Sequence, residues 1–595
     1  MQNKFVRGLL AASILAMTTA CVDDGNDGVN GSNGVDGTNG SAGEQGTPGA
    51  DGQSAPQSLA ISMVGRFVTP AEDKEGAAEI VQYHVASQMI YAINSSGAQA
   101  TIEIIDASDL GADVSDPLTD ESLTSTTFVL PTSVTAGANT LTISDANSIA
   151  IHGDLLAVAM AADAHADNGA ILFYDISTGT PALVKAVEAG NLPDMVTFTP
   201  DGSKALVANE GEPSGDYLVD PEGSVSIITI TDGMPADTAT QVTFTAFNGM
   251  QAELEAKKVR FSNPGNSTVA QDLEPEYIAT SNSTAYVAMQ ENNAMAKIDL
   301  TDNSVEIFGL GYKDWSINRI DVSNKDGVNF NTYAGLYGLY MPDTITMMNW
   351  KGADFILTAN EGDAREYFYD SGDEATCLAA GGVEYDEDDG CLSFIDEARV
   401  KDLDLDANSP LAINYDKDVL GRLKVIPAMG DTDNDGDHDE LYAFGARSFS
   451  IWDSNGLQVF DSGDDFGRIT AAVHGEQFNN DEDANEGDAR SDDKGGEPEA
   501  LTVGKIGQQT YAFVGLERMS SIFVYDVTNP YDVRFVDYFY NRDLTDGLEG
   551  TEISGDLAPE GMKFVAAEDS PTGEALLITG NEISGSVAVW QIKQQ

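Results

Sequence analysis

One pattern recurs along most of this chain of 595 residues, and it restricts the fold more than any other feature. A proline beside an acidic residue opens a short apolar stretch, and roughly sixteen to twenty-three residues later a second apolar stretch ends in Glu. Internal repeats of this kind indicate a repeat architecture. The acids directly after the prolines are Asp194, Glu276, Asp343, Glu499 and Glu560, and those ending the second stretches are Glu210, Glu291, Glu361, Glu517 and Glu582.

Short strands in a repeating module, with no helical periodicity between them, are typical of a β-propeller. Five clear units and two weaker ones, around residues 81–106 and 148–176, predict an all-β fold: a single β-propeller of about seven blades with loop insertions. A long acidic insertion at about 366–440 leaves open whether the strand in FGARSFSIWD, from Phe444, completes the fifth blade or belongs to an eighth. Two β-sandwiches are the alternative, but they do not explain the recurring acid.

Equivalent positions in the blades of a propeller lie on a ring, so each of the two sets of acids is expected to form a ring. Clustered carboxylates repel one another unless a cation or an arginine lies among them. The sequence therefore indicates a metal or cation site. The alternative is that each acid caps backbone amides within its own tight turn.

The first 20 residues are typical of an export signal. Lys4 and Arg7 precede an apolar run at 8–17 that is too short for a membrane span. Small residues then lead to Cys21, which predicts a bacterial lipoprotein with lipid on Cys21. Because Thr18 stands where Leu is usual, ordinary cleavage remains the alternative. We expect a lipid-held protein at the outer membrane or cell surface of a Gram-negative bacterium, with its propeller domain at 58–595.

The segment 21–57 between this anchor and the propeller is expected to be a spacer. Glycine falls at every third position from Gly25 to Gly52, which is the pattern of a collagen triple helix. Only Pro48 lies inside this run, so prolines that would stabilise such a helix are scarce. A collagen-like stalk that forms a homotrimer and a disordered linker that does not are both compatible with the pattern.

Acidic residues greatly outnumber basic ones, at 98 Asp and Glu against 30 Lys and Arg, for a formal net charge of −68. This charge excludes nucleic acid as a partner, because little in the chain can neutralise a run of phosphates. In an exported protein, Cys377 and Cys391 are expected to form a disulfide. Two free thiols or a metal pair are the alternative.

The strongest local motif is DTDNDGDHDELY, which starts at Asp431. Acidic or amide side chains at positions 1, 3 and 5 with Gly at position 6 are typical of a calcium loop, because alternate oxygens surround the ion. Position 12 is Tyr442 where an EF-hand has Glu, so a shortened calcium loop is predicted, with a solvated acidic turn as the alternative. Its candidate calcium ligands are Asp431, Asp433, Asp435, Asp437 and Asp439.

The hexapeptide NEGDAR occurs twice, at 360–365 and 485–490. If the two loops converge, their acids are candidate metal ligands and nearby arginines are candidates to orient a phosphate group. The alternative is that these arginines are salt-bridge partners. No HExxH, GxSxG or Walker motif is present. The candidate metal ligands are Glu361, Asp363, Glu486 and Asp488, and the candidate catalytic residues are Arg365, Arg490 and Arg518.

Several of these motifs, among them LVANEGE, LTANEGDAREY and FVGLERMSSIFVYDVTNP, resemble the bacterial choice-of-anchor I family. The chain is also similar to mesenchyme-specific cell-surface glycoproteins. The resemblance implies a YVTN-like or quinoprotein-like propeller displayed at the cell surface. We therefore expect a surface-anchored, calcium-binding lipoprotein that acts as a binding or adhesion module. Because some family members are described as alkaline phosphatases, a metal-dependent phosphoesterase is the alternative.

Overall fold

A computed structural model describes residues 58–70, 74, 76–262, 264–386, 389–413, 415–482, 484–545 and 553–595. The predicted signal peptide, the lipidated Cys21 and the Gly-X-Y spacer lie outside these residues. The described residues belong to one compact unit. No helix within them is both long and apolar enough to cross a membrane.

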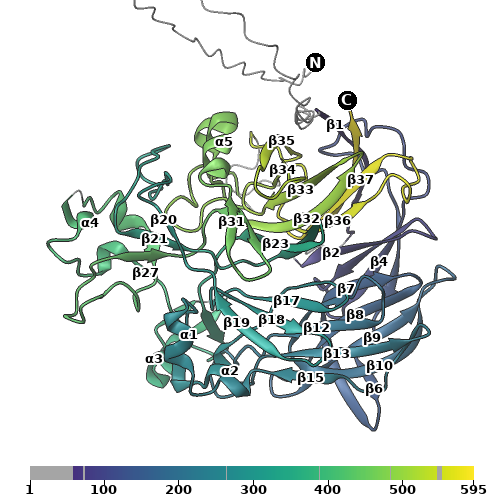
Figure 1. The fold of residues 1–595 in the computed structure, drawn as a ribbon, viewed down its shortest axis with the longest axis horizontal. Helices are drawn as coiled ribbons and strands as arrows, with labels where there is room; N and C mark the ends of the chain where they lie inside the picture. The colour runs from purple at the N-terminus through teal and green to yellow at the C-terminus, as the bar shows by residue number, and fades with distance from the viewer. Residues whose placement is uncertain are drawn as a thin grey trace, which may run out of the picture. The chain divides into compact units, whose positions relative to one another are not determined.

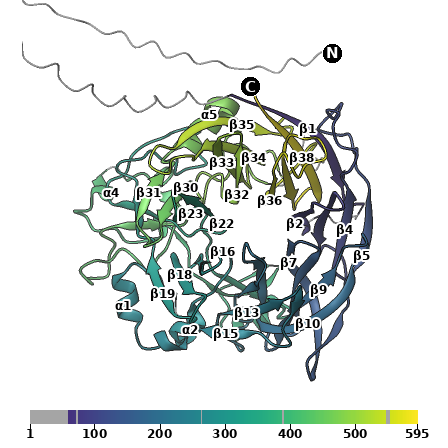
Figure 2. The same cartoon turned by 45° about the vertical axis from the view of Figure 1, so that its right-hand side comes forward.

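Seven antiparallel sheets of four or five strands make up most of the described chain. Figure 2 shows them around a common centre, with inner strands such as β2, β16, β22 and β32 nearest to it. The prediction of an all-β propeller of about seven blades is confirmed. Blade 1 contains β2 (Ala77–His84), β3 (Met89–Asn94), β4 (Thr101–Asp106) and β5 (Ser125–Val129); blade 2 contains β6 (Ser133–Ala136), β7 (Asn139–His152), β8 (Leu155–Ala162), β9 (Asn168–Asp175) and β10 (Ala182–Asn191).

The next three blades follow in chain order. Blade 3 contains β11 (Pro193–Phe198), β12 (Lys204–Asn209), β13 (Ser224–Thr231), β14 (Met234–Pro235) and β15 (Thr240–Thr243). Blade 4 contains β16 (Ile278–Thr280), β17 (Thr284–Met289), β18 (Ala294–Asp299) and β19 (Val305–Gly309). Blade 5 contains β22 (Ile345–Trp350), β23 (Ala353–Asn360), β30 (Ser448–Asp453) and β31 (Gln458–Asp461), so the strand of FGARSFSIWD completes this blade.

The last two blades close the ring. Blade 6 contains β32 (Pro498–Ile506), β33 (Gln509–Leu516), β34 (Ser521–Asp526) and β35 (Arg534–Tyr540). Blade 7 combines β1 (Leu59–Val68) with β36 (Pro559–Val565), β37 (Ala575–Asn581) and β38 (Ser586–Gln594). β1 pairs antiparallel with β38 from Leu59–Gln594 to Val68–Ser586, so strands from both ends of the described chain share one blade. Figure 2 shows β1 and β38 side by side.

Apolar side chains between neighbouring blades form the core. Each pair of adjacent blades, including blades 7 and 1, shares a cluster of buried residues. Between blades 5 and 6, for example, Phe449, Phe523 and Tyr525 pack together, with ring centroids of Phe449 and Tyr525 4.6 Å apart. Because blades pack on both faces, strands such as β8 are apolar along most of their length.

Segments between the blades and one long insertion within blade 5 carry the helices and the smaller sheets, and Figure 1 shows most of them to one side of the ring. After blade 3 come η1 (Thr245–Phe247), α1 (Gln251–Ala256), η2 (Pro264–Asn266) and α2 (Val269–Asp272), and before blade 5 come β20 (Tyr312–Asp314) and β21 (Leu336–Leu339). Between β31 and β32 lie α5 (Asp465–His474) and η5 (Gly475–Gln477).

The longest insertion runs from β23 to β30. It contains β24 (Glu366–Tyr369), α3 (Glu374–Ala380), β25 (Glu384–Asp386), β26 (Gly390–Ile395), β27 (Ala398–Arg399), η3 (Val400–Asp402), α4 (Pro410–Ile413), η4 (Leu420–Arg422), β28 (Lys424–Val425) and β29 (Leu441–Ala443). Cys377 of α3 and Cys391 of β26 form the predicted disulfide and are fully buried. The bond ties the only two cysteines of this insertion together.

Candidate functional site

The inner strands of several blades are preceded by the same unusual backbone conformation. The residue before the proline has a positive φ, at 44° for Leu192, 41° for Met341, 49° for Glu497 and 57° for Ala558. A residue with a Cβ adopts this conformation at an energetic cost, and such positions gather at functional sites. The strand register also shifts directly after the proline in β11, β32 and β36. Such bulges re-aim side chains, here the acid that follows the proline.

In three of the repeats, a backbone hydrogen bond places the second acid beside the first. The N–H of the Glu that follows the second strand donates to the carbonyl of the left-handed residue. The N···O distances are 2.9 Å for Glu210 to Leu192, 2.9 Å for Glu517 to Glu497 and 3.0 Å for Glu582 to Ala558. The repeat therefore presents two neighbouring carboxylates from one end of a blade.

These carboxylates, together with Glu79 of β2, form one cluster that we call the axial acids. The sequence predicted two separate rings, but the structure interleaves them. Carboxylate oxygens of Asp343, Glu361 and Glu499 all lie within 4.8 Å of one another. Asp194 of blade 3 interacts electrostatically with both Glu79 of blade 1 and Asp343 of blade 5. The axial acids are Glu79, Asp194, Glu210, Glu276, Glu291, Asp343, Glu361, Glu499, Glu517, Glu560 and Glu582.

For many of the axial acids, burial raises the pKa, and repulsion between neighbouring carboxylates raises it further. The pKa of Glu79 rises to about 8 and that of Asp194 to about 7. Five others have a pKa well above the usual range for the same two reasons: Glu210, Glu276, Asp343, Glu499 and Glu560. Unless a cation neutralises them, these groups retain protons at a pH at which exposed carboxyl groups are ionised.

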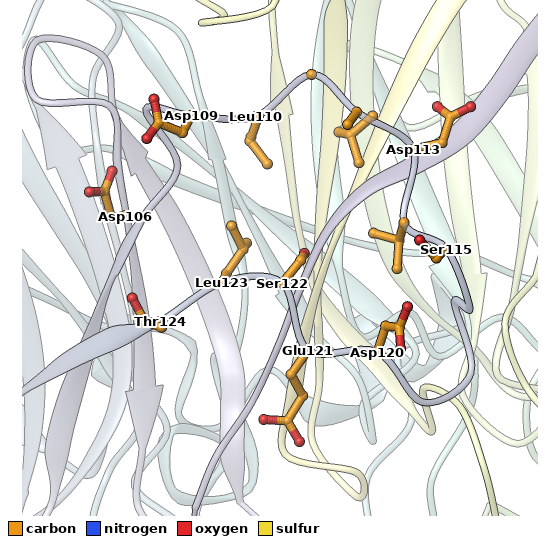
Figure 3. Close-up of a pocket in the computed structure, with 14 residues that line it drawn as sticks. Asp106, Asp109, Leu110, Asp113, Ser115, Asp120, Glu121, Ser122, Leu123 and Thr124 are labelled. Atoms are coloured by element: carbon orange, nitrogen blue, oxygen red, sulfur yellow. The ribbon is translucent and has the colours of Figure 1, made fainter.

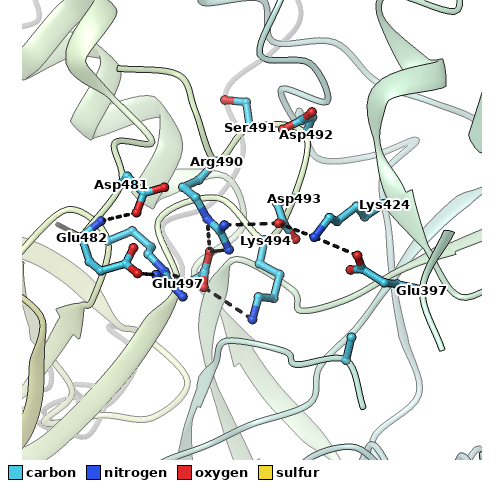
Figure 4. A network of polar contacts seen from close by, with 12 residues as sticks. Glu397, Lys424, Asp481, Glu482, Arg490, Ser491, Asp492, Asp493, Lys494 and Glu497 are labelled. Atoms are coloured by element: carbon cyan, nitrogen blue, oxygen red, sulfur yellow. Dashed lines mark hydrogen bonds and ion pairs between the residues drawn. The ribbon is translucent and has the colours of Figure 1, made fainter. Parts of the chain in front are cut away.

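A neighbouring carboxylate, Glu497, is neutralised by the chain itself, as Figure 4 shows. Its Oε1 accepts hydrogen bonds from Arg490 Nε and Nη2 at 3.0 and 2.9 Å, and its Oε2 accepts one from Arg518 Nε at 2.9 Å. Lys494 Nζ lies 3.6 Å from Oε2. Burial alone would raise the pKa of Glu497, but Lys494, Arg490 and Arg518 lower it to about 2.

Lys494 also connects the two NEGDAR regions. Its Nζ lies 2.6 Å from Asp363 Oδ1 and 3.9 Å from Glu361 Oε1, both in the first NEGDAR loop. The two regions therefore meet, but their predicted metal ligands do not all come together. Glu361 joins the axial acids, Asp363 pairs with Lys494 and Glu486 is exposed.

Asp488, the fourth of these predicted ligands, lies apart from the axial acids in a local turn. Its Oδ1 accepts a hydrogen bond from Ser491 Oγ at 2.6 Å, and burial raises its pKa to about 7. Its backbone φ is 69°. The side chain is therefore engaged within its own turn.

The three predicted catalytic arginines bind carboxylates of the chain. Arg365 is buried, and its Nε donates to Glu274 Oε2 at 2.9 Å while its Nη1 donates to Asp272 Oδ1 at 3.1 Å. Arg490 pairs with Glu497 and, at 3.3 Å, with Asp493, and Arg518 pairs with Glu497 and Glu482. Each guanidinium group therefore has internal partners that an anionic ligand would have to displace.

The predicted calcium loop lies in the long insertion, between β28 and β29. Ligand oxygens of Asp431, Asp433 and Asp439 lie within 4.8 Å of one another. Asp431 accepts bonds from the N–H groups of Asp435 and Gly436, at 3.2 and 3.0 Å, which shape the turn. Gly436 has a φ of 102°, a conformation that glycine adopts readily.

The two other candidate ligands of this loop lie outside that group of three. Asp435 Oδ1 accepts a hydrogen bond from the N–H of Asp437 at 3.2 Å. The pKa of Asp437 rises to about 6 through burial and through the neighbouring Asp435, and the pKa of Asp433 is raised mainly by Asp435. The loop therefore accumulates negative charge at the surface.

A separate pocket of about 430 Å³ lies beside β1, lined by part of that strand and by residues 106–124. Figure 3 shows Leu110 and Leu123 pointing toward each other, with Asp113, Asp120 and Glu121 nearby. No lining residue is basic, so an anionic substrate finds no counter-charge there. None of the axial acids lines this pocket.

The chain is similar to one protein family and to individual relatives. The choice-of-anchor I domain matches residues 79–530. Gigasin-3a of Magallana gigas is 30% identical over 186 residues, covering 29% of this chain and 65% of that protein. The mesenchyme-specific cell surface glycoprotein of Strongylocentrotus purpuratus is 28% identical over 390 residues, covering 59% of this chain and 48% of that protein. The chain thus spans about half to two thirds of the length of these relatives.

Among solved structures, similar chains include Kuenenia stuttgartiensis hydrazine synthase, at 10% identity and a TM-score of 0.38, covering 89% of this chain and 98% of that one. The β-propeller domain of Myceliophteria thermophila Cps50 (Swd1) has 9% identity and a TM-score of 0.37, covering 90% of this chain and 100% of that one.

Sequence reasoning missed two acids of this region. Glu79, one of the axial acids, has no proline before it, so it does not match the repeated pattern. Glu497 lies beside Pro498 on its N-terminal side and was not among the acids that follow a proline.

Proposed function

The chain belongs to the choice-of-anchor I family, and from this premise we propose that it is a calcium-binding module displayed at the cell surface, where it binds or adheres to a partner. Its similarity to a cell-surface glycoprotein supports display outside the cell. The seven-bladed ring offers a rigid scaffold from which loops such as the long insertion project.

The observation that carries the calcium assignment is the convergence of Asp431, Asp433 and Asp439 in the DTDNDGDHDE loop. Calcium prefers carboxylate and carbonyl oxygens, and a loop with alternating acids and a turn glycine supplies them. In the calcium-rich exterior that the export signal implies, the ion would offset the repulsion between these carboxylates.

Anchoring is proposed to occur through lipid on Cys21, with the Gly-X-Y segment as a spacer. A Cys21→Ser variant expressed in a Gram-negative host tests this proposal. Radiolabelled palmitate should label the parent and not the variant. Equal labelling of both proteins, or labelling of neither, would contradict the lipid anchor.

The alternative of a phosphoesterase receives less support, because Arg365, Arg490 and Arg518 are all engaged by internal carboxylates. A phosphatase that uses these side chains needs them available to orient a phosphate group. An assay with an aryl phosphate, with and without calcium, separates the two functions. Calcium-dependent hydrolysis that disappears in Arg365→Ala would overturn the binding module as the principal function.

Thermal melting in calcium and in chelator tests the loop site. At a calcium concentration of 100 Kd, binding adds about 2.7 kcal/mol to stability. For a propeller of this size, that corresponds to roughly 2–3 °C. Asp433→Ala should lose this part of the calcium response, whereas Asp418→Ala, an exposed acid of the same insertion, should retain it. An unchanged response in Asp433→Ala would refute a stabilising ion in the loop.

A further inference from the structure

Glu499 differs from its neighbour Glu497 in having no cation of the chain to neutralise it. Its Oε2 atom is inaccessible to solvent and has no hydrogen-bond partner among the described residues. A buried oxygen without a partner costs free energy, and a buried carboxylate costs more. Oε2 atoms of Glu276, Glu291 and Glu560 are in the same situation. Several unpartnered acceptor atoms thus lie among the axial acids.

Glu499 is brought together with two acids of the adjacent blade. Asp343 lies just before β22 and Glu361 just after β23, and ligand oxygens of all three residues lie within 4.8 Å of one another. Glu361 is 8% exposed. Gln290 Nε2 donates to Glu361 Oε2 at 3.0 Å, which orients this carboxylate as outer partners orient metal ligands.

The nearest basic group, Lys494, offsets only part of the charge of this triad. Lys494 Nζ is 3.9 Å from Glu361 Oε1 but only 2.6 Å from Asp363 Oδ1 and 3.6 Å from Glu497 Oε2. Its charge is therefore directed mainly to acids outside the triad. Arg490 and Arg518 are likewise used by Glu497.

We propose that Asp343, Glu361 and Glu499 bind a calcium ion at the axis of the propeller, at a site distinct from the DTDNDGDHDE loop. Calcium accepts six to eight oxygen ligands in flexible geometry, so three carboxylates and the unpartnered oxygens around them suit it better than the strict octahedron of magnesium. The ion would supply the positive charge that arginines and Lys494 supply to Glu497. It would also link blades 5 and 6.

Calcium content after equilibrium dialysis tests this proposal on the full-length chain. The metal is measured in the parent, in Glu499→Gln, in Asp433→Ala and in the double variant. Glu499→Gln should bind one equivalent less calcium than the parent, and the double variant should bind one less than Asp433→Ala. Unchanged calcium content in Glu499→Gln would overturn the axial site.

The single variants separate this inference from the proposed function. Loss of one equivalent in Glu499→Gln but none in Asp433→Ala would support the axial site and contradict the loop site. Glu361→Gln serves as a second variant, with the same expected loss, in case Glu499→Gln folds poorly. Glu103→Gln is the matched control, because Glu103 is 4% exposed but accepts hydrogen bonds from Ser125 and Thr127 in blade 1. Its calcium content should equal that of the parent.

Discussion

Glu497 and Glu499 stand two places apart at the start of blade 6, and their surroundings are opposite. Glu497 is surrounded by Arg490, Lys494 and Arg518, which hold its pKa low. Glu499 has acids as neighbours and a buried oxygen without a partner, and its pKa is raised well above the usual range by burial and by Glu517. The contrast shows that burial alone does not decide the role of an acid. Whether the chain supplies the counter-charge determines if the acid is structural or free to bind a cation.

Replacing Glu497 or Glu499 with Gln should produce the largest difference in Tm. Glu497→Gln removes the main partner of Arg490 and Arg518 and one partner of Lys494. Breaking a buried ion pair costs about 3–5 kcal/mol. At this chain length we expect Tm to fall by roughly 3–5 °C, in calcium and in chelator alike. Differential scanning calorimetry measures the shift.

Glu499→Gln is the matched control for this experiment. In chelator it replaces a carboxyl group that has no counter-charge in the chain, so its Tm should equal or exceed that of the parent. In calcium, its Tm should rise less than that of the parent. The comparison fails if Glu497→Gln melts like the parent, or if Glu499→Gln is the more destabilised variant in chelator.

The pH dependence of stability gives an effect of intermediate size. Glu79 has a folded pKa of about 8 against an ordinary value of 4.5, so the folded state binds a proton that the unfolded state has released. Its stabilising contribution is complete below about pH 4.5 and is lost as the pH rises through 8. In chelator, Tm of the parent should therefore fall between pH 6.5 and 8.5, and Glu79→Gln should reduce this fall by about 1–2 °C.

A second buried group, His474, does not affect the stability between pH 6.5 and 8.5. Burial and the charge of Arg542 lower the pKa of His474 to about 4, so this residue opposes folding only as the pH drops below its ordinary value of 6.5. A Tm that rises with pH in chelator between 6.5 and 8.5 would contradict the predicted protonation of the axial acids.

The smallest effect is expected at Asp363, which pairs with Lys494 while its side chain is 51% exposed. A pair with one solvated partner contributes about 1 kcal/mol or less, so Asp363→Asn should change Tm by about 1 °C at most. Calcium content by dialysis should remain that of the parent. Loss of a calcium equivalent would place Asp363 in the axial site and weaken the contrast between Glu497 and Glu499.

Local patterns in the sequence predicted much of this molecule. The spacing of prolines and acids predicts the blades, because each unit is one short antiparallel module whose hydrogen bonds form within the unit. The disulfide also closes a short separation of 14 residues. The turn that brings Asp431, Asp433 and Asp439 together is equally local.

Such local patterns could not predict contacts between residues that lie far apart in the sequence. Arg365 binds Asp272 and Glu274, more than ninety residues earlier in the chain, because blades 4 and 5 pack side by side. The merging of two expected rings into one cluster depends on left-handed residues such as Leu192 and Met341, which no propensity for strand or turn favours at a β-strand start. The sequence also cannot show which acids receive arginines, since Glu497 and Glu499 flank the same proline.

Anomalous diffraction locates the ion most directly. Crystals of the full propeller are soaked with calcium and measured near a wavelength that enhances the anomalous scattering of calcium. We predict an anomalous peak about 2.3–2.6 Å from carboxylate oxygens of Asp343, Glu361 and Glu499. The same position in Glu499→Gln crystals should show no peak. A parent map with no peak beside these three residues, whether or not the loop at 431–439 holds an ion, would contradict the axial site.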